Sequence, residues 1–158
     1  MAKLKDSSNS TLLAVASIGG HWIQLLRIAK ALQNDYEVIY CSTHAKCATM
    51  VEGHKFYEIA DFSRWNVWKL PLALLKMIKI VRKERPKAVF STGAAPGLTA
   101  LLAAKLCGVR TIWIDSVANV EQLSASGRMA RHFVDKIYTQ WDNLSDGEKI
   151  SYAGNIFG

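Results

Sequence analysis

The chain has 158 residues, 50% of them hydrophobic and 21% charged, which is the composition of one globular domain and excludes a disordered chain. Twenty Lys and Arg against 13 Asp and Glu leave a formal net charge of +7. This favours an anionic partner such as a lipid surface, a pyrophosphate or nucleic acid, although a solvated basic surface explains it equally well. Three cysteines without close pairs argue against a disulfide framework and a structural zinc site, and they are typical of a reducing compartment.

The amino-terminal residues, 1–10, are polar and are expected to be a flexible leader before a single domain at 11–158. The first apolar run that follows is short. A membrane-spanning helix needs ~20 apolar residues, so neither a signal peptide nor a spanning helix is predicted. Any membrane contact would therefore be peripheral.

Strands and helices are predicted to alternate along the chain. Apolar runs bounded by turn residues predict strands at 11–17, 37–41, 56–59, 88–91, 110–114 and 136–139. Periodic apolar segments predict helices at 21–33, 46–52, 65–84 and 96–106, with Pro71 in an early turn of the third. This alternation predicts an α/β fold with a Rossmann-like parallel sheet and helices on both faces, because parallel strands require crossover connections.

The stretch from Ile114 to Trp141 is the most informative part of the sequence. A Ser- and Asn-rich loop leaves one predicted strand, a short basic helix follows, and a second strand ends in Gln140-Trp141. Ligands bind outside the carboxyl ends of parallel strands, so both loops mark a candidate site. The order Asp-Ser-Val-Ala-Asn-Val-Glu-Gln-Leu-Ser-Ala-Ser-Gly resembles the acidic-Ser-x-Ala-x-Val-x-x-Leu-Ser-x-Ser-Gly segment of the acceptor-side subunits of split GT-B glycosyltransferases. That family includes the membrane-recruiting subunit of the dolichol-pathway N-acetylglucosaminyltransferase and bacterial PssD-type polysaccharide proteins.

The resemblance covers almost the whole chain after residue 10 and implies a fold equivalent to the N-terminal half of a GT-B enzyme. It implies an acceptor-binding, membrane-associating subunit of a glycosyltransferase that moves sugar from a UDP-sugar to a polyprenyl-pyrophosphate-linked acceptor for surface polysaccharide. A donor-binding subunit would complete the cleft as a heterodimer, with Gln140 and Trp141 at the interface. The tail at 151–158 resembles the start of the crossing to a second domain. No cofactor is implied, and the expected location is cytoplasmic, peripheral on the inner face of the membrane.

A first glycine loop, Ser17-Ile-Gly-Gly-His21, lies between the first predicted strand and helix. Glycines let the backbone turn sharply, and free N–H groups at a helix start attract anions, so Ser17, Gly19 and Gly20 are candidates for acceptor or phosphate binding. MurG-type transferases carry a similar Gly-Gly-His here. His21, a candidate catalytic residue, could pair with a pyrophosphate as a cation or accept a proton from a sugar hydroxyl. A purely structural turn is the alternative.

A second glycine loop follows the strand at 88–91 and carries the candidates Gly93, Pro96 and Gly97. It is expected either to form a wall for the acceptor or donor phosphate or to be only a tight strand–helix connection.

The loop after the strand at 110–114 adds a candidate catalytic carboxylate, Asp115, and the binding candidates Ser116, Asn119 and Glu121. Most family members have Glu in place of Asp115, and commonly Arg in place of Asn119. Arg128, Arg131 and His132 could serve the phosphate instead, or form a solvated helix face.

The helix predicted at 65–84 is the membrane candidate. Lysines recur on one side of it, and two tryptophans at its start suit a membrane interface. The predicted contacts are Trp65, Trp68, Lys69, Lys76, Lys79 and Lys83. A core helix with a few solvated lysines is the alternative.

Other site types lack a signature in the sequence. The four histidines are scattered, so no metal site is predicted, and no nucleic-acid-binding motif appears. Two further functions remain open. One is a non-catalytic adaptor that recruits and stabilises the catalytic subunit at the membrane, and the other is a self-sufficient nucleotide-binding enzyme.

Overall fold

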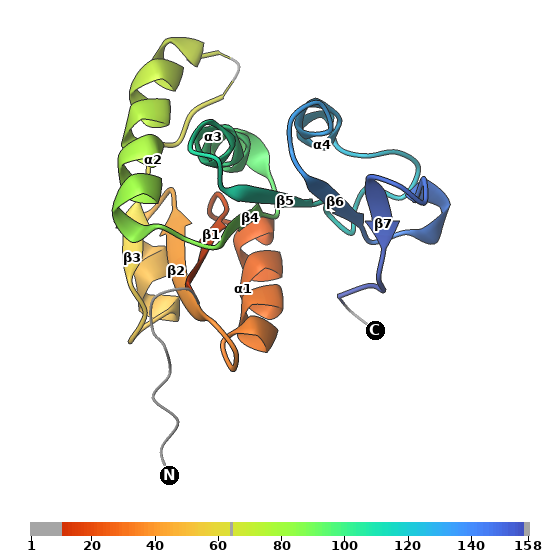
Figure 1. Cartoon of the computed structure of the whole chain (residues 1–158), viewed down its shortest axis with the longest axis horizontal. Helices are drawn as coiled ribbons and strands as arrows, with labels where there is room; N and C mark the ends of the chain where they lie inside the picture. The colour runs from red at the N-terminus through yellow and green to blue at the C-terminus, as the bar shows by residue number, and fades with distance from the viewer. Residues whose placement is uncertain (1–10, 64, 157–158) are drawn as a thin grey trace.

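The computed structural model describes residues 11–63 and 65–156, so the leader expected at 1–10 lies outside the described residues. Within them the strands form one parallel sheet (Figure 1). Its order is β3-β2-β1-β4-β5-β6-β7. The strands are Thr11–Val15 (β1), Glu37–Ser42 (β2), Phe56–Glu58 (β3), Ala88–Ser91 (β4), Arg110–Ile114 (β5), Lys136–Thr139 (β6) and Ile150–Tyr152 (β7). The order changes direction between β1 and β4, and ligands of such sheets bind at this point of the carboxyl edge.

Helices cover the two faces of the sheet unequally. The α-helices are Gly20–Leu32 (α1), Leu70–Glu84 (α2), Ala94–Leu106 (α3) and Ala125–Ala130 (α4). Short 3₁₀ helices lie at Ala45–Met50 (η1), Val67–Lys69 (η2) and Asp142–Leu144 (η3). Figure 1 shows α2, α3 and α4 on one side of the sheet and α1 on the other. Alternate strand residues therefore enter two cores, for example Leu13 and Ile39 beneath α2 and α3, and Leu12 and Val38 beneath α1.

The predicted parallel sheet with helices on both faces is confirmed, and the structure adds detail in three places. A seventh strand, β7, was not predicted because it is only three residues long in a polar tail. The short helix expected at 46–52 is the 3₁₀ helix η1 at Ala45–Met50. The helix expected at 65–84 is a regular α-helix only from Leu70, with Pro71 in its first turn, where a missing N–H costs no hydrogen bond.

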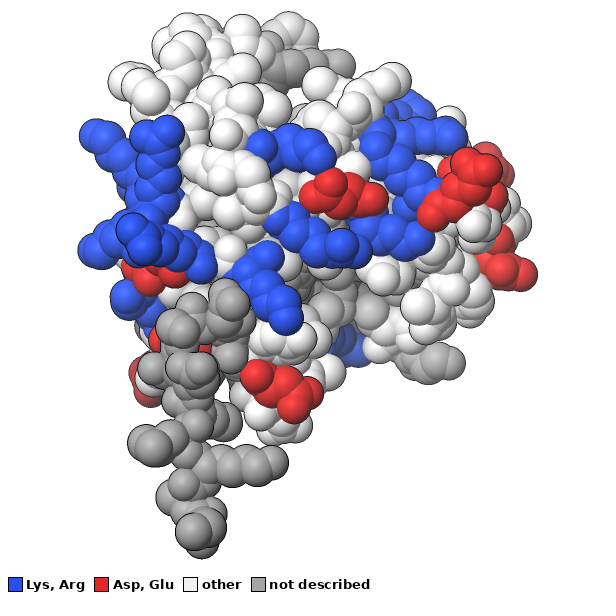
Figure 2. Space-filling model, in the orientation of Figure 1, with Lys and Arg blue, Asp and Glu red and all other residues white. Residues whose placement is uncertain are grey.

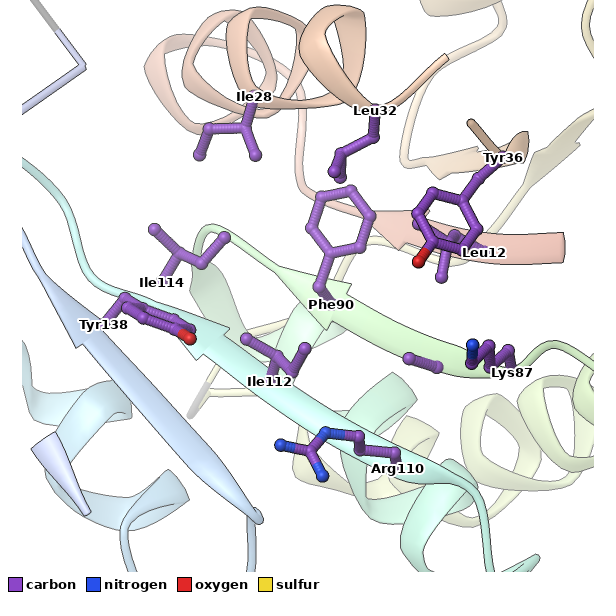
Figure 3. Close-up of a pocket in the computed structure, with 11 residues that line it drawn as sticks. Leu12, Ile28, Leu32, Tyr36, Lys87, Phe90, Arg110, Ile112, Ile114 and Tyr138 are labelled. Atoms are coloured by element: carbon purple, nitrogen blue, oxygen red, sulfur yellow. The ribbon is translucent and has the colours of Figure 1, made fainter. Parts of the chain in front are cut away.

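A groove lies on the α1 side, over β4, β5 and β6. It has a volume of about 350 Å³, and Figure 3 shows its side chains between α1 and these strands. The lining residues are Leu12, Ile28, Leu32, Tyr36, Lys87, Ala88, Phe90, Arg110, Ile112, Ile114 and Tyr138. A second hollow of about 360 Å³ shares Ile28, Ile114 and Tyr138 with it and continues to Gln140 and residues 153–156 at the carboxyl edge. Among the described residues, helices fully cover only one face of this part of the sheet, and α1 borders the other face with Ile28 and Leu32.

Candidate functional site

The two glycine loops lie side by side at the carboxyl edge. They follow β1 and β4, which pair in parallel with Val15 opposite Ser91. Gly19 precedes α1 and Gly93 precedes α3, and neither helix start is capped by a side chain. Backbone N–H groups at an uncapped helix start are available to an anion, and the helix dipole favours negative charge there. Gly19 and Gly20 are exposed, with open space where a Cβ would point.

His21 joins the two loops through Thr92. The imidazole Nδ1 lies 3.0 Å from the carbonyl oxygen of Thr92, and the Thr92 hydroxyl donates to the carbonyl oxygen of His21 at 2.6 Å. These contacts link segments that are 71 residues apart in the chain. His21 is half-buried, so it remains accessible from the edge of the sheet.

The second glycine loop is packed more tightly than the first. Gly93, Pro96 and Gly97 are all buried. A Cβ on Gly97 would lie 2.0 Å from the Ser91 hydroxyl oxygen, and that hydroxyl accepts a hydrogen bond from the Gly93 N–H at 3.2 Å. Pro96 and Gly97 therefore help α3 pack against the sheet beneath the edge. This fits the alternative that the loop is a tight strand–helix connection.

Asp115 organises the loop that follows β5. Its side chain is buried, with 1% of the residue exposed. The carboxylate accepts hydrogen bonds from the Trp113 indole N–H at 2.9 Å and from the N–H and hydroxyl of Ser124 at 2.9 and 2.6 Å. Its carbonyl oxygen accepts from the buried amide of Gln24 at 3.0 Å. All these bonds go to neighbouring segments, so the geometry gives the Asp115 carboxylate a positioning role within the loop.

The remaining candidates of this loop differ in exposure. The Ser116 hydroxyl accepts a hydrogen bond from the Ala118 N–H at 3.2 Å, which closes a turn. Asn119 is half-buried and Glu121 is exposed. Two side chains from beyond β6 hold the loop in place: the Trp141 indole donates to the Val117 carbonyl at 2.7 Å, and Asn143 donates to the Val120 carbonyl at 3.1 Å.

The structure also gives Gln140 intramolecular partners. Gln140 is buried, and its amide oxygen accepts from the Ile156 N–H at 3.0 Å while its amide nitrogen lies 3.5 Å from the Asp115 carbonyl. Gln140 is only 4% exposed and its amide is engaged within the chain, so its side chain offers little surface to a partner. Trp141 is half-buried, so part of its ring remains accessible.

Arg128 of α4 and Arg131, which directly follows this helix, are engaged within the chain. The Arg128 guanidinium donates to the Leu123 carbonyl at 2.7 Å, and Arg131 forms an ion pair with Asp146 at 3.4 Å. Both support the local fold, and neither is a free cation for a phosphate.

The first turns of α2, together with η2 and Trp65 before it, carry an exposed apolar patch at what we call the start of α2. It is defined by Trp65, Val67, Trp68, Leu72 and Leu75. Trp65, Trp68 and Leu72 are 77%, 70% and 74% exposed. The basic residues of α2 lie mostly in its later turns. Figure 2 shows Lys and Arg gathered over those turns, whereas the end that holds the start of α2 is largely uncharged. The Lys76 ammonium donates to the Glu58 carbonyl at 2.5 Å, so it braces α2 against the end of β3.

The part of the chain that the structure describes contains neither a metal-ligand cluster nor a membrane-spanning helix. No group of three or more His, Cys, Asp or Glu side chains is arranged to hold a metal ion. Among these residues no helix combines the length and the apolar character needed to cross a membrane.

Comparison with known proteins identifies the family. The model of the family described as "Oligosaccharide biosynthesis protein Alg14 like" matches residues 42–156. The UDP-N-acetylglucosamine transferase subunit ALG14 of Mus musculus is 22% identical over 178 residues, which cover 92% of this chain and 82% of the mouse protein.

A second group of relatives is longer than this chain. In Streptococcus pyogenes serotype M5 (strain Manfredo), the UDP-N-acetylglucosamine--N-acetylmuramyl-(pentapeptide) pyrophosphoryl-undecaprenol N-acetylglucosamine transferase is 25% identical over 154 residues. These cover 89% of this chain but only 42% of that transferase.

Solved structures show the same fold at low sequence identity. Acinetobacter baumannii MurG matches with a TM-score of 0.76 at 16% identity, covering 90% of this chain and 45% of the MurG chain. The UDP-N-acetylglucosamine 2-epimerase of Rickettsia bellii matches with a TM-score of 0.72 at 13% identity, covering 94% of this chain and 46% of the epimerase. The sheet therefore has the fold of the N-terminal half of GT-B proteins. With the family match over residues 42–156, this chain belongs to the family of Alg14-like oligosaccharide biosynthesis proteins.

Proposed function

We propose that this chain is the acceptor-binding, membrane-associating subunit of a two-component glycosyltransferase. The observation that carries the proposal is the carboxyl edge, where the starts of α1 and α3 and the side chain of His21 meet beside Gly19 and Gly93. An anionic diphosphate fits the free N–H groups, and His21 lies close enough to them to reach a sugar attached to that diphosphate. We assign Ser17, Ser116, Asn119 and Glu121 to the rim of this site, because the loops that carry them follow β1 and β5 at the same edge of the sheet.

In this proposal the donor is a UDP-sugar held by a second subunit. The mouse relative is named as a subunit, and the longer transferase relatives extend well beyond the region that this chain matches. The relatives' names specify UDP-N-acetylglucosamine, which we take as the donor to test first. The partner docks over the carboxyl edge, where it closes the cleft above His21.

The groove on the α1 face also supports the proposal that a partner subunit packs against this chain. Parallel sheets normally have both faces covered, because their strands are apolar on both sides. Here Phe90, Ile112 and Ile114 line a groove that no described helix covers. Lys87 and Arg110 lie at its amino end and would favour an acidic segment of the partner.

Contact with the membrane is assigned to the start of α2. Exposed tryptophans and leucines suit the interface between headgroups and acyl chains, while Lys69, Lys79 and Lys83 are exposed and can meet anionic lipid. We place the protein peripherally on the cytoplasmic side of the membrane, where a lipid-linked acceptor would be presented to the carboxyl edge.

The experiment is reconstitution of sugar transfer with the purified chain, the purified donor-binding subunit and both together. The assay uses UDP-N-acetylglucosamine and a lipid-diphosphate-linked sugar. We expect turnover only from the pair. We expect His21→Ala to lower it by ~10²–10⁴-fold, the usual range for general acid–base catalysis, with the complex intact. Turnover by the chain alone would contradict the proposal.

The alternative function is a non-catalytic adaptor that only recruits and stabilises its partner. One observation favours it: the Asp115 carboxylate is engaged within the chain, so of the two catalytic candidates only His21 is accessible at this edge. In an adaptor, His21→Ala would leave turnover unchanged, and only changes at the partner or membrane surfaces would lower it.

A further inference from the structure

The hydrogen bonds of His21 determine which ring nitrogen carries the hydrogen. Nδ1 lies 3.0 Å from the Thr92 carbonyl oxygen. A carbonyl oxygen only accepts, so Nδ1 must be the donor. In the neutral imidazole, Nε2 then bears a lone pair. No described residue forms a hydrogen bond with Nε2, so this lone pair is available at the edge of the sheet.

Gly93 makes this arrangement possible. A Cβ at position 93 would lie 2.3 Å from Nδ1 and 2.4 Å from Cε1 of His21, far inside van der Waals contact. The backbone there has φ of 149°, a conformation that residues with a side chain rarely adopt. Only glycine leaves room for the imidazole ring at this distance from the main chain, where Nδ1 reaches the Thr92 carbonyl.

We infer that Thr92 and Gly93 are positioning residues that hold His21 with its hydrogen on Nδ1 and a lone pair on Nε2. This inference rests on the proposed function and defines the part His21 plays in it. His21 accepts the proton of an acceptor hydroxyl, and it does not act as a cationic contact for the diphosphate.

In the resulting transfer step, one bond to the anomeric carbon forms while another breaks. The acceptor hydroxyl oxygen forms a bond to the anomeric carbon of the nucleotide sugar. The bond from that carbon to the diphosphate oxygen breaks, and its electron pair leaves on the nucleoside diphosphate. The hydroxyl proton moves to Nε2, which gives an imidazolium that still donates from Nδ1 to Thr92.

The chain contains its own control for the tautomer. Nδ1 of His44 accepts a hydrogen bond from the Lys46 N–H at 3.0 Å, so the neutral His44 ring carries its hydrogen on Nε2. Long-range ¹H–¹⁵N NMR of the labelled chain at about pH 8.5, where histidine is ordinarily neutral, should report opposite tautomers for His21 and His44. A hydrogen on Nε2 of His21 would overturn the inference.

The matched pair of variants is Gly93→Ala and Gly108→Ala. Both glycines have positive φ, but a Cβ at Gly108 (φ of 72°) meets nothing within 4 Å. In the assembled complex, Gly93→Ala should abolish the Nδ1–H signal of His21 and lower kcat by ~10²-fold, with little change in the KM for the nucleotide sugar. Gly108→Ala should change neither. Equal effects of the two variants would contradict a specific role for Gly93.

The tautomer measurement needs neither a partner nor turnover. If Gly93→Ala fails to fold, the wild-type spectrum still decides the inference. If the reconstituted pair transfers no sugar, the proposed function fails while the tautomer can still be read. If the pair is active and His21 carries its hydrogen on Nε2, only the positioning inference is overturned.

Discussion

The Asp115 carboxylate holds its own loop in place, although the sequence predicts it as a catalytic residue. Its place after β5, in an acidic-Ser motif, predicts a catalytic carboxylate at the edge. The structure turns the carboxylate toward Trp113 and Ser124, and a Cβ on Gly127 would lie only 2.7 Å from it. The motif therefore fits a requirement of the fold: an acceptor that closes the loop onto the start of α4.

We expect Asp115→Ala to lower the free energy of unfolding by ~2–4 kcal/mol, because it leaves the buried Trp113 indole N–H and the half-buried Ser124 N–H without an acceptor. Glu121→Ala, on an exposed side chain of the same loop, should change it by less than about 0.5 kcal/mol. Urea unfolding measures both. Loss of turnover in Asp115→Ala at unchanged stability would return Asp115 to a catalytic role.

Sequence patterns locate the candidate residues but not their partners. The turn glycines and His21 follow a predicted strand, so their place at the carboxyl edge could be predicted. Thr92 and Gln24 could not be identified in this way, because their hydrogen bonds cross 71 and 91 residues of chain. A polar Gln24 within the apolar face of a predicted helix was the one available signal.

At the scale of elements, α2 is fixed to β3 at its carboxyl-terminal end. Glu84 accepts hydrogen bonds from the Tyr57 hydroxyl and from the Lys55 ammonium at 3.1 Å. Burial opposes ionisation, but these two bonds outweigh it and hold the pKa of Glu84 below its ordinary value. Burial, together with the Glu84 carboxylate, raises the pKa of Tyr57 to about 12, so Tyr57 remains a hydrogen-bond donor at neutral pH.

The hydrogen bonds that Glu84 accepts make the free energy of unfolding depend on pH. Because the folded pKa of Glu84 is lowered, the carboxylate stabilises the fold above its unfolded pKa, and this contribution is lost as pH falls through the folded value. Glu84→Gln should therefore be less stable than wild type by ~1–2 kcal/mol at pH 7. The difference should shrink toward about pH 3, below the ordinary range of glutamate. A difference that stays constant with pH in urea unfolding would contradict this assignment.

The start of α2 is the element through which we expect membrane binding. Trp68→Ser combined with Leu72→Ser should release the protein from anionic vesicles, because about 1.5–3 kcal/mol of apolar transfer free energy is lost for each large side chain. The melting temperature should hardly change, since both residues are more than two-thirds exposed. Leu106→Ser is the control, at a 64% exposed leucine of α3 outside the patch. Unchanged sedimentation of the double variant with vesicles would contradict the assignment.

At the scale of the whole molecule, the repeated strand–helix pattern predicts the parallel sheet and its class of fold. It cannot predict how many helices cover each face, because a buried strand is apolar on both sides whether or not a helix of the same chain covers it. The groove over β4, β5 and β6 becomes visible only once α1 is placed (Figure 3). β7 is too short to produce a periodic signal.

The groove yields a prediction about assembly. Ile112→Asp replaces an apolar lining side chain with a charged one and should reduce co-purification with the donor-binding subunit at least tenfold, because desolvating a carboxylate is costly at an apolar contact. Ile23→Asp is the matched control, at a 44% exposed isoleucine of α1 that does not line the groove. If both variants assemble like wild type with unchanged melting temperatures, the partner does not use this face.

The most direct test of the proposed function is whether the purified chain binds the lipid-linked acceptor more tightly than the nucleotide. Isothermal titration should measure its affinity for a short-chain prenyl-diphosphate-linked sugar and for UDP. We expect the lipid-linked diphosphate to bind at the loops of Gly19 and His21, and UDP to bind at least ten times more weakly. Micromolar affinity for UDP, with weaker binding of the lipid-linked sugar, would contradict the proposed function and indicate a nucleotide-binding enzyme instead.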